Sequence, residues 1–303
     1  MKHQKKRSKS KLIIWSILIL IFVTVGGFWA VGHFDSKQPT KPKTVRLTAI
    51  GDSLTYGVGD PSGKGGYTNL IRKKVNRSQH NVVMTTSNFG ISGETTDQIN
   101  HRVITSKKLQ ASIKQADVIT VTTGGNDMLH FLKGNIGIQN DKLLSQQLKK
   151  YSLVYQKRVT RLLESIRHLN KHVQLFVFGI YNPVYVYFPQ VSFISRSIQV
   201  NNQITKRVVL GQSNVHFIPI DKKLSDGQYQ TAQSRTKLRK QATVFNHSDM
   251  AAGELEKMLG GQSTESNKYL SDEDHFHPNK LGYGIMTNLL YKEMRQYLNW
   301  LKE

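Results

Sequence analysis

Short apolar runs alternate with amphipathic stretches along most of the chain. Five runs have the length and the β-branched composition of buried strands, at residues 45–50, 81–88, 117–123, 173–179 and 215–220. Between and after them, apolar positions recur about every 3.6 residues, which predicts helices, at residues 67–75, 98–116, 143–170 and 281–301. This alternation predicts a parallel sheet covered by helices on both faces and joined by right-handed crossovers.

The N-terminal segment follows a different pattern. A basic cluster without an acidic residue, residues 1–11, precedes a run without any charged residue, residues 12–32. A helix needs roughly 20 apolar residues to cross the hydrocarbon core, so the run predicts a transmembrane signal-anchor helix. The basic flank should stay in the cytoplasm, which places the rest of the chain outside the cell. The alternative is a cleaved signal peptide and a secreted domain, because residues 30–32 resemble a small-x-small cleavage site.

The remaining sequence divides into a linker and one domain. Residues 33–44 hold two prolines among lysines and polar residues, which predicts a linker. Residues 45–303 are enough for one domain with its own core. Within it, residues 222–271 are dominated by Gln, Ser, Lys and Thr, with a helical patch at residues 250–259. This segment is expected to be either an insert or lid over the site, or a polar excursion on the surface.

The chain carries a net charge of +23 and has no cysteine. Its first 43 residues hold nine Lys or Arg and one acidic residue, so the domain keeps +15. This positive charge either belongs to an ordinary solvated surface or attracts anionic lipid headgroups or cell-wall polymers outside the membrane. Nucleic acid is a poor partner, because the predicted compartment is wrong and no recognition module is visible. The lack of cysteine excludes disulfides and a lipid-modified cysteine anchor.

Two predicted strands end in residues with candidate chemistry. Ser53 lies in the segment GDSL, residues 51–54, directly after the first strand. It is therefore expected at the carboxyl edge of the sheet, where ligands bind in open α/β folds. Asn126 lies in GGND, residues 124–127, after the third strand, and its amide can donate hydrogen bonds into a cleft at that edge. Alone, each segment is an ordinary turn composition.

Two further segments are expected at the same edge. Residues 88–96 follow the second strand, and the glycines at positions 90 and 93 suit a loop whose backbone N–H approaches a ligand closely. Near the C-terminus, Asp274 precedes His277 by three residues, a spacing that can place both on one side of a turn. The carboxylate can then orient the imidazole, which takes the serine proton. Together the four segments predict a nucleophilic serine site.

These segments resemble the GDSL (SGNH) family of serine ester hydrolases. The resemblance covers the domain from residue 45 to the final helix and rests on residues 51–54 (GDSL), 91–95 (ISGET), 124–127 (GGND) and 274–278 (DHFHP). It implies a three-layer α/β/α sandwich with a five-stranded parallel sheet, similar to flavodoxin, in agreement with the order of the predicted elements. Within the anchored subset, the chain looks like the lipase/acylhydrolase proteins of Gram-positive bacteria.

The resemblance also implies roles for individual residues. Ser53 is expected to be the nucleophile, His277 the general base and Asp274 the group that orients His277. The oxyanion hole is expected to consist of the Ser53 N–H, the Gly93 N–H and the Asn126 side-chain amide. No cofactor is implied, and no metal ion is predicted because the histidines lack metal-site spacing.

A second pair with the same spacing, Asp272 and His275, is the alternative choice for the orienting carboxylate and the general base. The family pattern places a proline directly after the catalytic histidine, and Pro278 follows His277. This favours the later pair.

Other residues near these segments have structural expectations. Gly90 is the alternative oxyanion glycine, but Gly93 fits better in its Ser-Gly-acid-Thr context. Asp52 and Asp127 are expected to hold loops through side-chain hydrogen bonds to the backbone. Residues 57–65 look phosphate-binding, but they lack the Gly at position 58 and the Ser or Thr at position 65 that a P-loop requires.

The predicted function is a membrane-anchored extracellular ester hydrolase that works through an acyl-enzyme. A lysophospholipid or a short-chain acyl ester is the first expectation for its substrate. The alternative is deacetylation of a cell-wall or extracellular polysaccharide, which the family also performs, and a hypothesis from another class is a non-catalytic wall-binding protein on the same fold. The aromatic run at residues 181–188 either lines an acyl or glycan pocket or packs a loop.

Overall fold

A computed structural model describes residues 42–79, 81–135, 138, 140–189, 191–242 and 266–302. The predicted transmembrane segment 12–32, most of the linker and the helical patch 250–259 lie outside these residues. Among the helices of the described ranges, none combines the length and the apolar character needed to span a bilayer.

Five parallel strands form one sheet in the order β2-β1-β3-β4-β5. The strands are β1 (Lys43–Gly51), β2 (Val82–Gly90), β3 (Val118–Val121), β4 (Gln174–Phe178) and β5 (Val215–Ile218). Every neighbouring pair is parallel. All five predicted strands are therefore confirmed, with ends that shift by a few residues.

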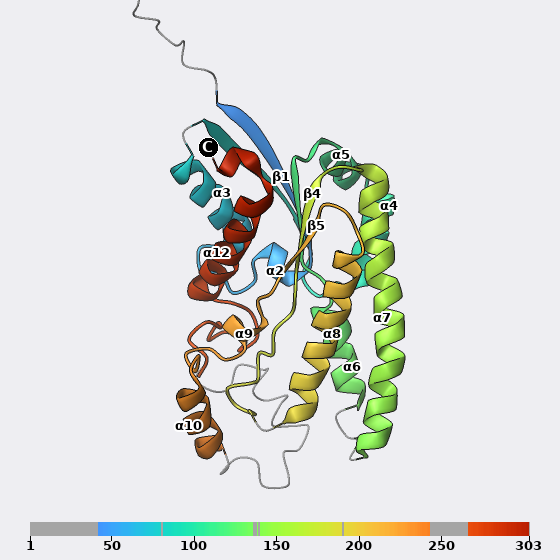
Figure 1. Ribbon diagram of the computed structural model, residues 1–303, viewed down its shortest axis with the longest axis vertical. Helices are drawn as coiled ribbons and strands as arrows, with labels where there is room; N and C mark the ends of the chain where they lie inside the picture. Colours follow the sequence, from blue (N-terminus) through green and yellow to red (C-terminus); the bar gives the residue numbers. More distant parts are fainter. Residues whose placement is uncertain are drawn as a thin grey trace, which may run out of the picture. The chain divides into compact units, whose positions relative to one another are not determined.

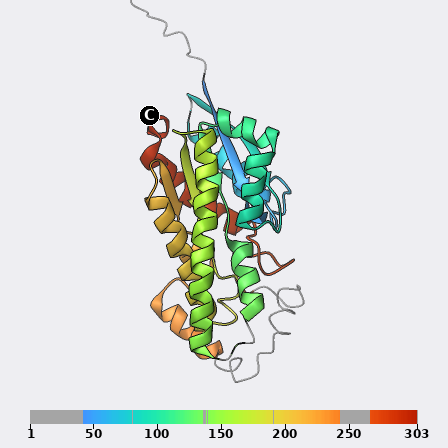
Figure 2. The ribbon, with the colours of Figure 1, turned by 90° about the vertical axis from the view of Figure 1, so that its right-hand side faces the viewer.

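Helices cover both faces of the sheet (Figure 1). One face carries α3 (Gly66–Ser78) and α12 (Lys280–Tyr297), followed by the 3-10 helix η1 (Asn299–Leu301). The other face carries α4 (Thr96–Thr105), α5 (Lys107–Gln115), α7 (Asp141–Leu169) and α8 (Ser192–Leu210). Figure 2 shows α7 in front, with α8 on one side and α4 and α5 on the other. The predicted α/β class with a five-stranded parallel sheet is thus confirmed.

The core forms on both faces because residues of β1 alternate between them. Val45, Leu47 and Ala49 are buried against α3 and α12, whereas Ile50 is buried against the helices of the other face. Alternate side chains of a strand point to opposite faces of the sheet, so apolar residues at both odd and even positions of β1 contribute to the core on both sides.

The strand order reverses at β1, because β2 lies on one side of it and β3 to β5 lie on the other. In open α/β sheets, ligands bind in the crevice outside the carboxyl ends of the strands at such a switch point. Helix α2 (Ser53–Tyr56) directly follows β1, and α6 (Gly125–Asn135) follows β3. Two segments of the predicted site therefore begin at this crevice.

The structure also contains elements that the sequence pattern did not predict. The helical stretch at residues 98–116 is two helices, which meet at Ser106, and the Ser106 Oγ accepts a hydrogen bond from the Leu109 N–H at 3.4 Å. Helices α6 and α8 are additional. The described part of residues 222–271 contains α9 (Asp221–Leu224) and α10 (Ala232–Ala242), and the role of this segment as a lid stays a prediction.

The half-buried His216 on β5 makes the stability of the fold depend on pH. His216 stacks on Tyr297 with ring centroids 3.6 Å apart, and its Nε2 lies 2.7 Å from the Gln174 Oε1. Burial, together with the nearby charge of Arg167, lowers the pKa of His216 from 6.5 to about 4. Between these two pH values the unfolded chain takes up a proton that the folded protein does not, so the free energy of unfolding falls as the pH falls.

We expect the variant His216→Gln to flatten this part of the pH dependence. Because the ring is partly exposed, the effect should be only about 1 kcal/mol, or about 2–4 °C in Tm between neutral pH and pH 4. Thermal unfolding of the full-length chain in detergent at several pH values measures it. His172→Gln, at an exposed position, is the control. Equal pH slopes for wild type and His216→Gln would contradict the prediction.

Candidate active site

Ser53 is the first residue of α2 and is held directly at the end of β1. The Asp52 side chain caps this helix, because its Oδ1 accepts hydrogen bonds from the Leu54 N–H at 3.1 Å and from the Thr122 Oγ1 at 2.7 Å. Burial raises the pKa of Asp52 despite these hydrogen bonds. Asp52 therefore ties the serine turn to the end of β3, which is the structural role expected for it.

Ser53, His277 and Asp274 form a continuous hydrogen-bonded chain. The His277 Nε2 lies 2.7 Å from the Ser53 Oγ, and the His277 Nδ1 lies 2.5 Å from the Asp274 Oδ2. The other Asp274 oxygen accepts from the backbone N–H groups of Phe276 and His277, each at 3.0 Å. Burial by itself raises the pKa of Asp274, but the hydrogen bonds from the His277 side chain and backbone outweigh it and lower the pKa below its ordinary value. The carboxylate stays ionised at neutral pH.

The loop that carries His277 is fixed by its neighbours. The Ser271 N–H donates to the His277 carbonyl at 2.8 Å, and the Tyr181 hydroxyl donates to the Phe276 carbonyl at 2.5 Å. His275 is only 1 % exposed and has a left-handed backbone with φ of 51°, whereas Asp272 is exposed. The structure thus brings the pair Asp274 and His277 to Ser53.

The two glycines of the second segment have different surroundings. A Cβ at Gly90 would lie 2.0 Å from the backbone nitrogen of Tyr56, so Gly90 allows α2 to pack against the end of β2. Gly93 is exposed, has a φ of 85°, and has open space where a Cβ would be. This left-handed backbone favours glycine.

Asn126 is the second residue of α6, and its side chain reaches the same loop. Its Nδ2 donates a hydrogen bond to the Glu94 carbonyl at 2.8 Å. A side-chain amide has two N–H donors, so one remains for a substrate oxygen. Asp127 joins the same two segments, since its Oδ2 accepts from the Thr96 N–H and from the Thr96 Oγ1, each at 2.8 Å. The structural role expected for Asp127 is confirmed.

Arg102 is a residue of this region that sequence reasoning missed. Its Nε lies 2.9 Å and 2.8 Å from the two carboxylate oxygens of Glu94. Its Nη1 donates to the Phe89 carbonyl and its Nη2 to the Gly51 carbonyl, both at 3.1 Å. Eight positions separate Glu94 from Arg102, which is not the spacing of neighbours on a helix, so no local pattern could reveal the pair.

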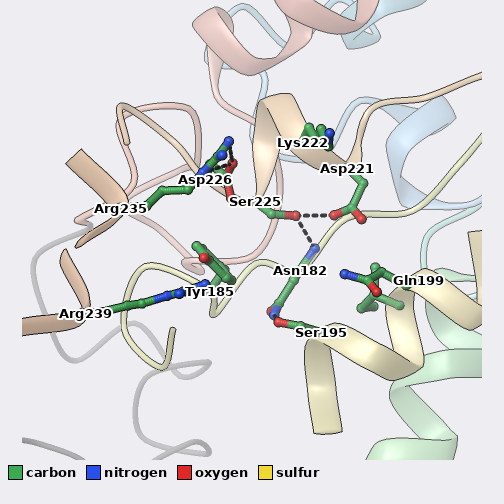
Figure 3. A pocket seen from close by; sticks show the side chains of 11 residues that line it. Asn182, Tyr185, Ser195, Gln199, Asp221, Lys222, Ser225, Asp226, Arg235 and Arg239 are labelled. Carbon is green, nitrogen blue, oxygen red and sulfur yellow. Dashed lines mark hydrogen bonds and ion pairs between the residues drawn. The ribbon is translucent and has the colours of Figure 1, made fainter. Parts of the chain in front are cut away.

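A polar cavity of about 210 Å³ lies among residues that follow β4 and β5 (Figure 3). Its floor is a buried network, in which the Ser225 hydroxyl donates to the Asp221 Oδ1 at 2.5 Å and accepts from the Asn182 N–H at 2.8 Å. Its other lining residues are Tyr185, Ser195, Ile198, Gln199, Lys222, Asp226, Arg235 and Arg239. Asp226 and Arg235 form an ion pair. The cavity is thus lined mainly by amide, hydroxyl and charged groups.

The aromatic run at residues 181–188 packs a loop, and its part in an acyl or glycan pocket stays a prediction. Tyr185 lines the polar cavity. Val184 and Phe188 are buried in a small apolar cluster with Met128 and Ile194, so they pack the loop. Where the structure describes the chain, no group of three or more His, Asp or Glu side chains is placed to hold a metal ion.

The site combines a hydroxyl, an imidazole and a carboxylate in series, which is the arrangement that serine acyl transfer requires. Residues 49–285 match the GDSL-like Lipase/Acylhydrolase family. Because the match spans most of the chain, the protein belongs to this family of lipase- and esterase-type hydrolases. The predictions of the family and of an enzyme that hydrolyses esters are confirmed.

The chain is similar to several known proteins, and the alignments cover different fractions of it. The uncharacterized protein YpmR of Bacillus subtilis (strain 168) is 27% identical over 94% of this chain and 97% of its own length. The spore germination lipase LipC of Bacillus licheniformis is 29% identical over 54% of this chain and 75% of its own length. The solved structure of the lipase Lip_vut3 from a goat rumen metagenome has a TM-score of 0.56 at 24% identity, covering 82% of this chain and 96% of that one. This last likeness concerns the fold.

We expect Asn126→Ala to lower kcat by roughly 10²–10³-fold with little change in KM, because it removes a preformed donor to the developing oxyanion. Initial rates with p-nitrophenyl acetate separate the two constants. Asn135→Ala, at the other end of α6, is the control, since the Asn135 side chain bonds only the Phe131 carbonyl among the contacts described here. A raised KM with unchanged kcat would show that Asn126 binds the ground state instead.

Proposed function

We propose that this protein is an extracellular serine ester hydrolase, tethered to the cell membrane by residues 12–32, in which Ser53, His277 and Asp274 act as a catalytic triad. The observation that carries the proposal is the hydrogen-bonded chain from the Ser53 Oγ through His277 to Asp274, with distances of 2.7 Å and 2.5 Å. Acyl transfer needs a hydroxyl beside a base whose other nitrogen is held by a carboxylate.

In the proposed reaction, the Ser53 Oγ attacks the acyl carbonyl carbon while its proton passes to the His277 Nε2. The carbonyl oxygen becomes an oxyanion, stabilised by the N–H groups of Ser53 and Gly93 and by the Asn126 amide. Collapse of this tetrahedral intermediate breaks the ester bond, and His277 gives its proton to the leaving alcohol. A water molecule, deprotonated by His277, then hydrolyses the acyl-enzyme and restores the Ser53 hydroxyl.

Two exposed apolar side chains beside Ser53 support an acyl ester as the substrate. Tyr56 is 60% exposed and ends the short helix that Ser53 begins, and Ile91 is 45% exposed and precedes Gly93 by two residues. The Ile91 N–H donates to the Gly51 carbonyl at 3.0 Å, and the Tyr56 N–H donates to the Asp52 carbonyl at 2.9 Å, so both residues are held next to the end of β1. We infer that they contact the acyl group of a lysophospholipid or short-chain ester. The similarity to a lipase, LipC, points the same way.

The polar cavity favours a second candidate, deacetylation of a polysaccharide outside the cell. One of its lining residues, Asn182, directly follows Tyr181, whose hydroxyl donates to the Phe276 carbonyl in the loop of His277. Amides, hydroxyls and cations at its surface, such as Gln199, Tyr185 and Lys222, suit a hydroxyl-rich or anionic leaving group better than an alkyl chain. The same chemistry suits the phosphate of a lysophospholipid, so the two substrates must be separated by experiment.

The test uses the full-length chain in detergent with three substrates: p-nitrophenyl esters of graded chain length, lysophosphatidylcholine and acetylated xylooligosaccharides. We expect Tyr56→Ser to raise KM for the longer acyl chains, while Leu153→Ser, also 60% exposed but on α7, has no effect. Faster turnover of the acetylated oligosaccharide than of every lipid ester would favour the second candidate. No hydrolysis of any of the three substrates would refute the proposed activity.

The proposed location has its own test. External protease should digest the domain in intact cells or protoplasts, and the full-length chain should fractionate with membranes. A soluble product that begins near residue 33 would show that the segment is a cleaved signal peptide. Protection of the domain from external protease would refute the orientation.

A further inference from the structure

The guanidinium of Arg102 joins three backbone segments at the carboxyl edge of the sheet. It contacts the carbonyl of Gly51 at the end of β1, the carbonyl of Phe89 near the end of β2, and the carboxylate of Glu94 in the following loop. Arg102 itself lies on α4. The side chains of Arg102 and Glu94 are only 18% and 14% exposed, so water competes little for these hydrogen bonds.

Two of the contacts of Arg102 lie close in the sequence to residues of the proposed oxyanion hole. Gly51 precedes Ser53 by two residues, and Glu94 directly follows Gly93. Moreover, the Glu94 carbonyl accepts the hydrogen bond from the Asn126 amide at 2.8 Å, which fixes the plane of that amide. One side chain therefore restrains the backbone that carries both N–H donors and, through Glu94, the third donor as well.

We propose that Arg102 is a positioning residue for the oxyanion hole: through Glu94 it holds the Gly93 N–H and the Asn126 amide in the geometry that the transition state requires. The inference rests on the function proposed above. Gly93 depends on such support, because its exposed loop with φ of 85° has nothing packed where a side chain would be. An oxyanion hole accelerates a reaction only if its donors are already in place, so a loosened loop should reduce kcat.

A planar guanidinium is suited to this task, because its fork of N–H groups binds one carboxylate and two carbonyls at once. Lysine, with a single ammonium group on a flexible stem, cannot reproduce this geometry. The ion pair between Arg102 and Glu94 does not by itself establish a positioning role, because removing one partner of a buried pair destabilises many proteins. A positioning role must therefore be separated from a purely structural one.

Arg167 provides the matched control. Its guanidinium also binds backbone carbonyls, those of Val173, Ser213 and Asn214 at 2.6 to 2.9 Å, but these residues precede β4 and β5 at the amino edge of the sheet. We expect Arg102→Gln and Arg167→Gln both to lower Tm. Only Arg102→Gln should lower kcat for p-nitrophenyl acetate, by about 10-fold to 100-fold, with KM nearly unchanged, when assayed well below both Tm values. Arg102→Lys should recover only part of the loss.

A double-mutant cycle makes the mechanism of Arg102 testable. If Arg102 acts by placing the oxyanion donors, Arg102→Gln should cost much less in an Asn126→Ala background, about 3-fold or less, because the two variants damage the same interaction. Additive losses, or equal kcat for Arg102→Gln and wild type, would overturn the proposal. Ser53→Ala in the same series separates the two levels: if Ser53→Ala remains active, the proposed function itself fails, whereas an inactive Ser53→Ala with an unaffected Arg102→Gln rejects only the role of Arg102.

Discussion

Replacing Ser53 with alanine should reduce ester hydrolysis by roughly 10⁴–10⁶-fold. The Ser53 Oγ is the group that His277 contacts at 2.7 Å, and no substitute nucleophile lies in this hydrogen-bonded chain. The measurement is kcat/KM with p-nitrophenyl acetate on the full-length chain, with covalent labelling by a fluorophosphonate probe as a second readout. Wild type should label at Ser53, and the variant should not label.

The loss of activity must not arise from unfolding. Ser53 is 6% exposed, and its side-chain hydrogen bond to His277 should contribute only about 1 kcal/mol to stability. The backbone of the turn is held instead by the Asp52 cap, which the substitution leaves intact. We therefore expect a nearly unchanged Tm. A variant that keeps wild-type turnover, or that still labels with the probe, would refute the assignment of the nucleophile.

The sheet could be predicted from the sequence because each strand is a short apolar run between clear breaks. The run at residues 45–50 has apolar residues at positions 45, 47, 49 and 50, which are buried on the two faces of the sheet, and the positions that follow it are where a switch point binds ligands. The motif GDSL could therefore be assigned to a sheet edge before any coordinates. The order β2-β1-β3-β4-β5 has no such local signal, because it depends on which strands pair across the assembled sheet.

Helix α8 could not be predicted with the same ease. Its residues 192–210 are rich in isoleucine and valine, with paired asparagines, a composition of low helix propensity. The helix forms because Ile204, Val208 and Val209 bury themselves with α7 against the sheet. Tertiary packing supplies most of the stability of such a helix, and this packing cannot be inferred from the local sequence.

The long-range contacts that hold the site together could not be predicted from the sequence either. Arg102 contacts Phe89, which is 13 positions away in the sequence, and Gly51, which is 51 positions away. These contacts exist only once β1, β2 and α4 are assembled. The same holds for the bond from Tyr181 to the Phe276 carbonyl, across 95 positions. Motifs reveal the residues that carry chemistry, whereas residues that position them are held by long-range contacts with no repeating spacing.

A single experiment can test whether His277 or His275 is the general base. His277→Ala should be as damaging as Ser53→Ala, roughly 10⁴–10⁶-fold in kcat, because it removes the base that accepts the serine proton. His275→Asn should keep most of the activity. His275 is buried with φ of 51°, a backbone that asparagine tolerates better than alanine, so this control limits the strain that the substitution adds.

The comparison is made on folded protein, by measuring Tm and kcat for both variants at the same temperature. The Asp274 carboxylate should remain in place in His277→Ala, since the backbone N–H groups of Phe276 and residue 277 still donate to it at 3.0 Å. Added imidazole should therefore restore part of the activity of His277→Ala by occupying the space between Asp274 and Ser53. If His275→Asn is the inactive variant and His277→Ala keeps turnover, the base belongs to the pair Asp272 and His275, and the proposed triad is displaced by two residues.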